Sequence, residues 1–172
     1  ACELLLSHTY NNVYNIRIRM PLGEIVSNRN LLQKLLKYEA WLNCDNSVTY
    51  IYDLFNFVYN TIITDDIQFG LYNVVSGGTF RAEVFYEIAL KHERDLIKAK
   101  LVKPYHLKNV EILDYPEFLD RELTVANRSN AILSNNIAVA ALGAEFHNIS
   151  DTTFLEKTLI RLIENASTIV KL

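Results

Sequence analysis

Glycine is scarce in this chain, and its scarcity excludes the common phosphate-binding loops. Only five of the 172 residues are glycine, and no GxGxxG or GxxxxGK spacing occurs. A dinucleotide-binding fingerprint and a P-loop both need such glycines, because the backbone must approach the phosphates closely. The chain also lacks a GxSxG elbow, and no Tyr is followed four residues later by Lys. The residues alone therefore predict no catalytic constellation in this chain.

Cysteine and histidine are also sparse. Cys2 and Cys44 are too few for a disulfide framework and lack CxxC spacing, which suits a reducing compartment. The four histidines show no pair at metal-ligand spacing and no carboxylate cluster beside them, so we expect no metal site. The first ten residues, ACELLLSHTY, have neither the basic region nor the cleavage site of a signal peptide. We therefore expect a cytoplasmic location.

An excess of positive charge and long hydrophobic runs are absent too. The 17 Lys and Arg residues are scattered and outnumbered by 20 Asp and Glu, for a net charge of −3. This distribution argues against a nucleic-acid partner. No apolar run approaches the roughly 18 residues that would span a bilayer, so we expect no membrane partner either. With half of its residues hydrophobic, the chain has enough apolar side chains for a packed core.

The most informative stretch is Asn15–Asn30, NIRIRMPLGEIVSNRN. Its alternating apolar residues predict a strand over 13–20, which Pro21 ends. Gly23 and the asparagines that follow predict a polar loop, and Asn28 or Asn30 is expected to cap the next helix. A loop at the carboxyl end of a strand is the usual ligand position in an α/β sheet. We therefore expect a binding surface here.

The remaining periodicity predicts helices on both sides of a second strand. The apolar run 71–75, followed by Ser76-Gly77-Gly78, predicts a buried strand and a turn. A short strand is expected over 48–51, and Pro116 is expected in a turn. One helix is expected to carry the apolar stripe from Leu31 to Leu42, and the next to be capped by Asp53, with Leu54, Phe55, Val58, Tyr59, Ile62 and Ile63 on one face. Two further helices are expected over 81–91 and 95–102. A short helix is expected to end at Gly143, and the last helix to begin with a Thr153–Glu156 capping box. Strands alternating with helices predict an α/β layered fold.

Several short motifs in this order resemble a known family. They are Arg19-Met20-Pro21, Ser27-Asn28-Arg29-Asn30, Asn46-Ser47-Val48-Thr49, Tyr50-Ile51-Tyr52-Asp53-Leu54, the segment from Gly70 to Gly78, and Arg128-Ser129-Asn130. The chain resembles the C-terminal half of an extended short-chain dehydrogenase/reductase acting on nucleotide sugars. Within that family it is most similar to the dTDP/UDP-4-dehydrorhamnose reductases, including the bifunctional 3,5-epimerase/4-reductase kind.

The resemblance implies the C-terminal part of a Rossmann-like NAD(P)-binding fold, with its substrate-binding subdomain and without the Gly-rich N-terminal half. The chain would be a single fragment, 1–172. It would hold the last Rossmann strands at about 13–20 and 71–75, and a substrate-binding subdomain at about 22–66 and 79–172. The implied activity is NAD(P)H-dependent reduction of a 4-keto-6-deoxy sugar nucleotide in rhamnose-type synthesis. Because NADP or NAD would be bound mainly by the missing half, we expect this chain alone to be inactive.

The resemblance also implies which residues bind. Met20 and Pro21 would lie beside the nicotinamide, and Asn28 and Asn30 near the sugar or nucleotide. Arg128 would contact the diphosphate, which its planar fork suits, and Asn130 would join it in binding substrate. Each has a structural alternative: the asparagines would cap a helix, and Arg128 would be a surface charge.

Other readings of the same pattern remain open. The parent protein would be a 4-epimerase or a 4,6-dehydratase of the same superfamily, or the chain would be a non-catalytic sugar-nucleotide binding or partner module. A homodimer is compatible with each reading. Strand 13–20 needs parallel neighbours on both sides, because such strands are normally buried on both faces. We therefore expect the isolated chain to be poorly soluble or partly molten.

Overall fold

The structure, a computed structural model, describes residues 11–64, 67–123 and 131–169. The helical segment expected before His8 lies outside these ranges. The elements are β1 (Tyr14–Arg17), β2 (Pro21–Leu22), α2 (Leu31–Leu35), β3 (Ala40–Leu42), β4 (Thr49–Tyr50), α3 (Ile51–Tyr59), the π-helix η1 (Asn60–Thr64), β5 (Gly70–Asn73), α4 (Ala82–Lys91), α5 (Glu93–Lys98), the 3-10 helix η2 (Leu107–Asn109), β6 (Glu111–Leu113), α6 (Tyr115–Asp120), α7 (Asn136–Leu142) and α8 (Thr152–Ile169).

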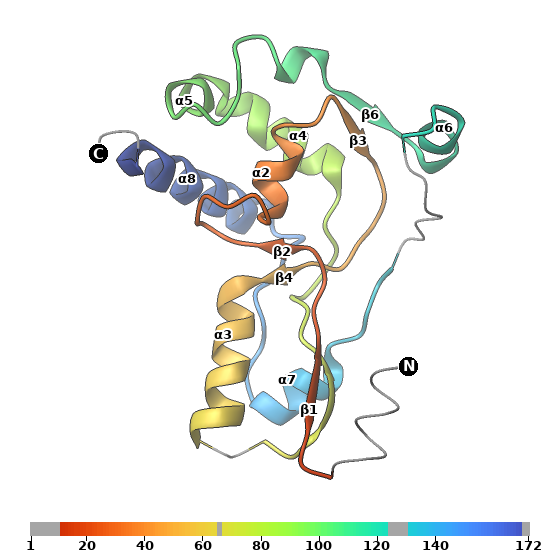
Figure 1. Ribbon diagram of the computed structural model, residues 1–172, viewed down its shortest axis with the longest axis vertical. Helices are drawn as coiled ribbons and strands as arrows, with labels where there is room; N and C mark the ends of the chain where they lie inside the picture. The colour runs from red at the N-terminus through yellow and green to blue at the C-terminus, as the bar shows by residue number, and fades with distance from the viewer. Residues whose placement is uncertain (1–10, 65–66, 124–130, 170–172) are drawn as a thin grey trace.

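The described elements form two lobes joined at β2 and β4 (Figure 1). The large lobe contains α2, α4, α5 and α8, and the small lobe contains β1, β5, α3 and α7. Each lobe has its own cluster of buried hydrophobic side chains. The segment between β1 and α2 therefore lies where the two lobes meet.

Parallel pairing links strands that are distant in sequence. β1 pairs with β5 from Tyr14 opposite Gly70 to Arg17 opposite Asn73. β2 pairs with β4, and β3 with β6, also in parallel. Parallel pairs joined through helices are typical of α/β folds, so the expected fold class is confirmed.

Aromatic and aliphatic side chains fill the large lobe. Trp41 stacks on Phe85 with ring centroids 5.6 Å apart, and Tyr86 meets it edge-on at 5.7 Å. The buried face of α8 packs against α4 and α5. Its hydrophobic residues are Leu155, Leu159, Leu162, Ile163 and Ala166. In the small lobe, Phe57 of α3, Tyr72 of β5 and Ala138 of α7 share the second cluster.

The expected helix through Leu42 is wrong in its second half. α2 ends at Leu35, and Trp41 and Leu42 belong to strand β3, opposite Ile112 and Leu113 of β6. The apolar residues keep a helical spacing beyond Leu35, where α2 ends. The burial of Trp41 and the pairing with a strand 71 residues away (Trp41 opposite Ile112) override that local pattern.

The expected caps of two helices are also wrong. α3 begins at Ile51 after Tyr50, and Asp53 lies inside its first turn. Its apolar face differs as well: Phe57 is buried, whereas Phe55, Tyr59 and Ile63 are exposed. α8 begins at Thr152, and the Asp151 side chain accepts a hydrogen bond from the backbone N–H of Thr153 at 2.9 Å.

Three further expectations differ from the structure. Glu156, expected in a capping box, instead bonds Lys91 at 2.6 Å and His92 at 2.7 Å, and these bonds lower the pKa of its carboxyl. Pro116 lies in the first turn of α6, where proline's missing N–H costs nothing. α5 ends at Lys98, short of the expected 102.

Candidate functional site

Residues 18–30, here called the elbow, carry the chain from the small lobe to the large lobe. β1 ends at Arg17 and β2 begins at Pro21, so the chain changes sheets within three residues. Met20 makes this change with a φ of +35°. A bulky residue in the left-handed region is a genuine outlier, and such residues cluster at functional sites. The expected ligand-facing loop therefore contains a strained residue that its surroundings hold in place.

Arg19 fixes the elbow to the segment before α3. Its backbone N–H donates to Thr49 Oγ1 at 3.0 Å, and its carbonyl accepts from the N–H of Thr49 at 2.7 Å. The guanidinium Nη2 donates to Asn46 Oδ1 at 3.0 Å. Nε is buried and has no hydrogen-bond partner among the described residues. One donor of Arg19 is therefore unused at the carboxyl end of β1.

Asn73 ends the neighbouring strand β5 and has a matching feature. Its Nδ2 donates to the carbonyl of Ser134 at 3.0 Å, but its buried Oδ1 has no partner among the described residues. A buried polar atom without a partner costs about 1–3 kcal/mol, so such atoms call for a bound water or ligand. A donor on Arg19 and an acceptor on Asn73 thus follow the two parallel strands at the edge where α/β folds bind ligands.

The segment 131–135 lies along this edge. The Ala131 carbonyl accepts from the N–H of Ser47 at 3.1 Å, and the N–H of Leu133 donates to Ser47 Oγ at 2.9 Å. Asn135 Nδ2 donates to the Val75 carbonyl at 2.9 Å, just past β5. The late motif that ends at Asn130 is therefore followed directly by residues beside β5 and the Asn46–Thr49 motif.

Cys44 lies next to Arg19's partner and is not disulfide-bonded. Asn46 Nδ2 donates to Cys44 Sγ at 2.7 Å. Burial raises the pKa of the thiol, against a smaller lowering by the hydrogen bond from Asn46. A thiol that stays protonated is a poor nucleophile, so Cys44 serves here as a packing and hydrogen-bonding group.

A buried carboxylate anchors the middle of the elbow to α8. Glu24 is 7% exposed, and its Oε1 accepts from Tyr50 Oη at 2.6 Å and from Arg161 Nη1 at 2.7 Å. Asn165 donates to the Glu24 carbonyl at 2.8 Å. Burial, followed by the hydrogen bond to Glu24, raises the pKa of the Tyr50 hydroxyl. Tyr50 is therefore a stable hydrogen-bond donor at neutral pH rather than a proton-transfer group.

A second buried carboxylate connects α3 to the turns after β5 and α7. Asp53 is 4% exposed and accepts from Ser76 Oγ at 2.6 Å, and its Oδ1 lies 2.6 Å from His147 Nδ1. The serine hydroxyl donates to the carboxylate and not to the imidazole. A hydrolytic triad requires the serine–histidine contact, so this cluster is structural.

The expected binding residues occupy different environments. Met20 is half-buried against the large core, and Pro21 pairs with Thr49 in the β2–β4 ladder. Asn30 caps α2, as expected, and its Nδ2 donates to the carbonyls of Gly23 and Ile25. Asn28 is exposed, and its Oδ1 accepts from Lys37 Nζ at 3.0 Å. Arg128 and Asn130 lie outside the described residues. Ligand binding by these six residues stays a prediction.

The pattern of the sequence did not reveal Glu24, Tyr50, His147 or Arg161 as parts of this region. Their contacts join residues 26 to 137 positions apart, which no local spacing encodes. Asp53 was found, but as a cap. The available signal was chemical: Glu24 stands alone in an otherwise apolar and Asn-rich loop.

The described residues contain neither a cluster of metal-ligating side chains nor a helix suited to a membrane. Within the described ranges, no three His, Cys, Asp or Glu side chains come together as a metal site would require. None of the described helices combines the length and apolar composition needed to cross a bilayer.

Comparison with known proteins finds similarity in fold. No family profile and no curated relative matches the sequence. The L780 UDP-rhamnose synthase from Acanthamoeba polyphaga mimivirus is similar over 95% of this chain and 49% of its own, with a TM-score of 0.59 and 20% identity. The dTDP-4-dehydrorhamnose reductase from Bacillus anthracis str. Ames, solved in complex with NADP, is similar over 92% of this chain and 51% of its own, with a TM-score of 0.53 and 19% identity. The chain thus spans about half the length of these structures, and the Rossmann-like α/β fold that the resemblance implied is confirmed.

Proposed function

We propose that this chain is the substrate-binding part of a nicotinamide-dependent reductase that acts on a 4-keto-6-deoxy sugar nucleotide, as in rhamnose-type synthesis. The observation that carries the proposal is a coincidence of fold and motif. The fold similarity to a UDP-rhamnose synthase extends over 95% of the chain. The motif Arg19-Met20-Pro21 begins two residues after the end of β1 and runs into β2, in the elbow. We also propose a cytoplasmic site of action.

The described residues fit one side of a nicotinamide site. Met20 and Pro21 offer a half-buried apolar wall, and the unpaired polar atoms of Arg19 and Asn73 would hydrogen-bond a polar ligand at the same edge. NADPH or NADH, when bound, would supply the hydride. No Gly-rich loop is present to hold its diphosphate, so that part of the cofactor would be held by residues outside this chain.

The residues of this chain would position the substrate and leave the chemistry to others. Asn28 and Arg128 would bind the sugar nucleotide, while the glutamate of the elbow, Glu24, holds the loop against α8. The acid Tyr and the Lys of the resembled family have no counterpart in a Tyr-x-x-x-Lys spacing here. The chain alone is therefore expected to bind substrate without reducing it.

Nucleotide binding tests the first half of the proposal. UDP and dTDP would be titrated into the chain by isothermal calorimetry, together with Arg128→Ala and, as a matched control, Arg94→Ala on the exposed surface of α5. Loss of a charge-assisted contact to phosphate costs about 1.5–3 kcal/mol, so Arg128→Ala should weaken binding at least about tenfold. Absence of binding, or equal binding by both variants, contradicts the proposal.

Turnover tests the second half. The chain would be assayed alone and joined to a nicotinamide-binding half of the reductase type, with NADPH or NADH and a UDP- or dTDP-linked 4-keto-6-deoxy sugar. The expected result is reductant consumption only in the joined protein. With a UDP- or dTDP-linked hexose in place of the keto sugar, conversion without net reductant consumption would identify an epimerase or dehydratase. Nucleotide binding without any turnover would identify a non-catalytic module.

A further inference from the structure

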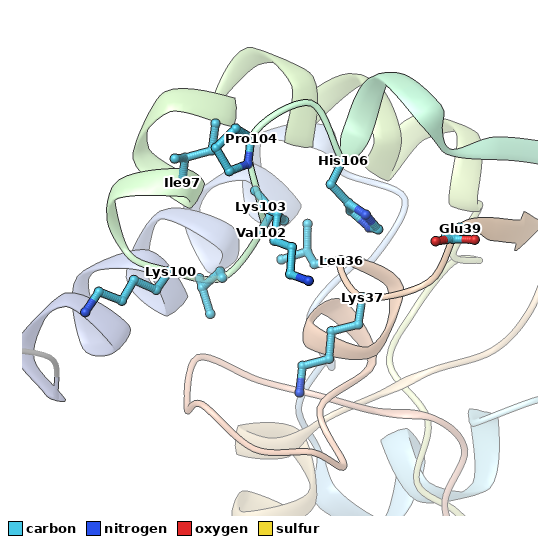
Figure 2. A pocket seen from close by; sticks show the side chains of 10 residues that line it. Leu36, Lys37, Glu39, Ile97, Lys100, Val102, Lys103, Pro104 and His106 are labelled. Carbon is cyan, nitrogen blue, oxygen red and sulfur yellow. The ribbon is translucent and has the colours of Figure 1, made fainter.

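A cavity in the large lobe is lined by residues to which the proposed function gives no role. Its volume is about 560 Å³, which is within the usual range of roughly 300–1,000 Å³ for small-molecule sites. It lies between the end of α2 and the loop that follows α5 (Figures 1 and 2). Both walls come from the same lobe, so the cavity belongs to the substrate-binding part itself.

Positive charge surrounds this cavity although the chain as a whole is acidic. Lys37, Lys100 and Lys103 line it against one carboxylate, Glu39, whereas the net charge of the chain is −3. Lys37 donates to Asn28 Oδ1 at 3.0 Å. Lys100 and Lys103 are exposed and form no ion pair with any described residue. Two ammonium groups are thus free to meet an anion.

His106 adds a polar atom that lacks a partner. Its Nε2 is buried and has no hydrogen-bond partner among the described residues, although the side chain lines the cavity. In Figure 2, Lys103 and His106 extend from the loop toward the side of the cavity where Lys37 lies. An anionic oxygen in this space would be attracted by the lysines, and a rotation of the imidazole would expose Nε2 to it as a hydrogen-bonding group.

A tight turn holds these two side chains in place. The N–H of His106 donates to the Lys103 carbonyl at 3.1 Å, with Pro104 and Tyr105 between them. Proline at the second position and a left-handed residue at the third are the marks of a type II turn. That third residue is Tyr105, with φ +64°, where glycine would be unstrained. Lys103 and His106 are therefore the fixed ends of one turn.

The floor of the cavity is apolar. Leu36 is 1% exposed, Leu101 8% and Val102 7%, and Ile97 and Pro104 complete the lining. A fully hydrated inorganic ion would gain nothing from these side chains, whereas an organic body would bury apolar surface against them. The cavity therefore suits a ligand with a charged head and an apolar body.

We propose that this cavity is an accessory site for a small organic phosphate, distinct from the nicotinamide wall at Met20 and Pro21 and connected to the elbow through the Lys37–Asn28 hydrogen bond. The phosphate would lie between Lys103, His106 and Lys37, and the organic part on Leu36 and Val102. Lysine binds phosphate as a point charge, and the one carboxylate, Glu39, leaves the lining net positive. No bond is made or broken at this site.

The test is a titration of the ¹⁵N-labelled chain, followed by amide chemical shifts. The probes are phenyl phosphate, inorganic phosphate, benzoate and benzyl alcohol. Phenyl phosphate is expected to shift the amides of residues 36–37, 100–103, 105 and 106, and to bind at least about tenfold more tightly than inorganic phosphate or benzyl alcohol. Tighter binding of benzoate than of phenyl phosphate would overturn the assignment to a phosphate.

Variants connect the binding to the named side chains. Lys103→Gln and the double variant Lys103→Gln/His106→Gln are expected to weaken phenyl phosphate at least about tenfold, while Lys157→Gln on the exposed face of α8 leaves it unchanged. Lys103 is exposed, so its substitution leaves the fold intact and its amide spectrum provides the check. Equal affinity in Lys103→Gln and Lys157→Gln, or shifts spread outside the cavity, would overturn the proposal.

Discussion

At the scale of single residues, Glu24 determines where the elbow lies. Its carboxylate is almost fully buried and is bonded by Tyr50 from β4 and Arg161 from α8. A buried carboxylate without partners would be strongly unfavourable, and removing one partner of such a pair leaves the other uncompensated. The conformation of Met20 and Pro21 therefore depends on residues that would never touch the ligand themselves.

Tyr50→Phe tests this dependence through the pH profile of stability. The pKa of Tyr50 is raised above its ordinary value of 10.0 in the folded state, chiefly by burial. Above pH 10 the unfolded tyrosine loses its proton while the folded one keeps it, so the contribution of Tyr50 to stability falls as pH rises. We expect the free energy of unfolding of the wild type, measured in urea, to fall more steeply between pH 9.5 and 11 than that of Tyr50→Phe.

Exposed Tyr59 provides the control for this measurement. Tyr59→Phe should follow the wild-type pH dependence, and at pH 7 only Tyr50→Phe should be destabilised, by about 1.5–3 kcal/mol for a hydrogen bond to a charged group. Parallel pH profiles for all three proteins would rule out the buried Tyr50–Glu24 contact.

At the scale of elements, the end of α5 shapes one wall of the accessory cavity. The N–H of Leu101 donates to the Leu96 carbonyl and the N–H of Lys100 to the Ile97 carbonyl, both at 3.0 Å. This pair of bonds is a Schellman motif, which places its C′ residue in the left-handed region. That residue is Lys100, with φ +58°. Its lysine side chain is therefore retained where glycine would fit the backbone better.

At Lys100, glycine should stabilise the protein more than alanine, which is the reverse of their order inside a helix. Lys100→Gly is expected to be more stable than Lys100→Ala by about 1 kcal/mol, because only glycine adopts the left-handed conformation without cost. At the exposed position Glu87 within α4, the order should be the opposite: Glu87→Ala should be more stable than Glu87→Gly by about 1 kcal/mol. Urea denaturation of the four variants measures both differences. The same order at both positions would show that α5 ends differently.

At the scale of the whole molecule, the small lobe exposes apolar surface. Tyr52, Phe55 and Tyr59 of α3 and Ile63 of η1 are 48%, 62%, 59% and 63% exposed, and their spacing places them on one helix face. Ile18 and Leu71, beside the β1–β5 pair, are 45% and 43% exposed. Contiguous patches of this kind mark surfaces that another segment or molecule covers. They also agree with the expectation that strand 13–20 needs more neighbours than it has here.

Replacing Phe55 and Tyr59 together by serine should reduce self-association of the isolated chain. The two side chains have few core contacts to lose, so stability should change by no more than about 0.5 kcal/mol. Light scattering after size-exclusion chromatography would follow the mass across a range of protein concentrations. The buried neighbour Phe57, 0% exposed, is the control: Phe57→Ser should cost about 3–5 kcal/mol and destroy the fold. A wild type that stays monomeric at every concentration would contradict this reading of α3.

Local signals predicted the elements that depend on one residue's chemistry. Asn30 caps α2, and Gly143 ends α7 with a φ of +68°. The prediction that Trp41 lies in a helix was wrong because its neighbours come from β6 and α4, which helical spacing cannot anticipate. The prediction that Asp53 caps its helix was wrong because its carboxylate bonds His147, 94 residues away, instead of the backbone of that helix. The sequence therefore predicted those features that local residues determine, and missed those that depend on contacts with distant segments.

The sequence predicted the position of the elbow but not the contacts that determine its conformation. Pro21 and the asparagines marked a loop after a strand, and that loop is where the chain changes sheets. The positive φ of Met20 and the unpaired atoms of Arg19 and Asn73 arise from pairing between distant strands. No periodicity of one segment contains that information, because the constraint comes from the other strand.

The bonds between Glu24 and α8 also set an order in time. Arg161 and Asn165 lie 137 and 141 residues after Glu24, and contacts of such separation close late in folding because loop-closure entropy must be overcome first. During synthesis the elbow leaves the ribosome long before its anchor exists. It can reach its final shape only when α8 has been made, so the elbow, although it lies early in this chain, is completed among the last parts of the fold.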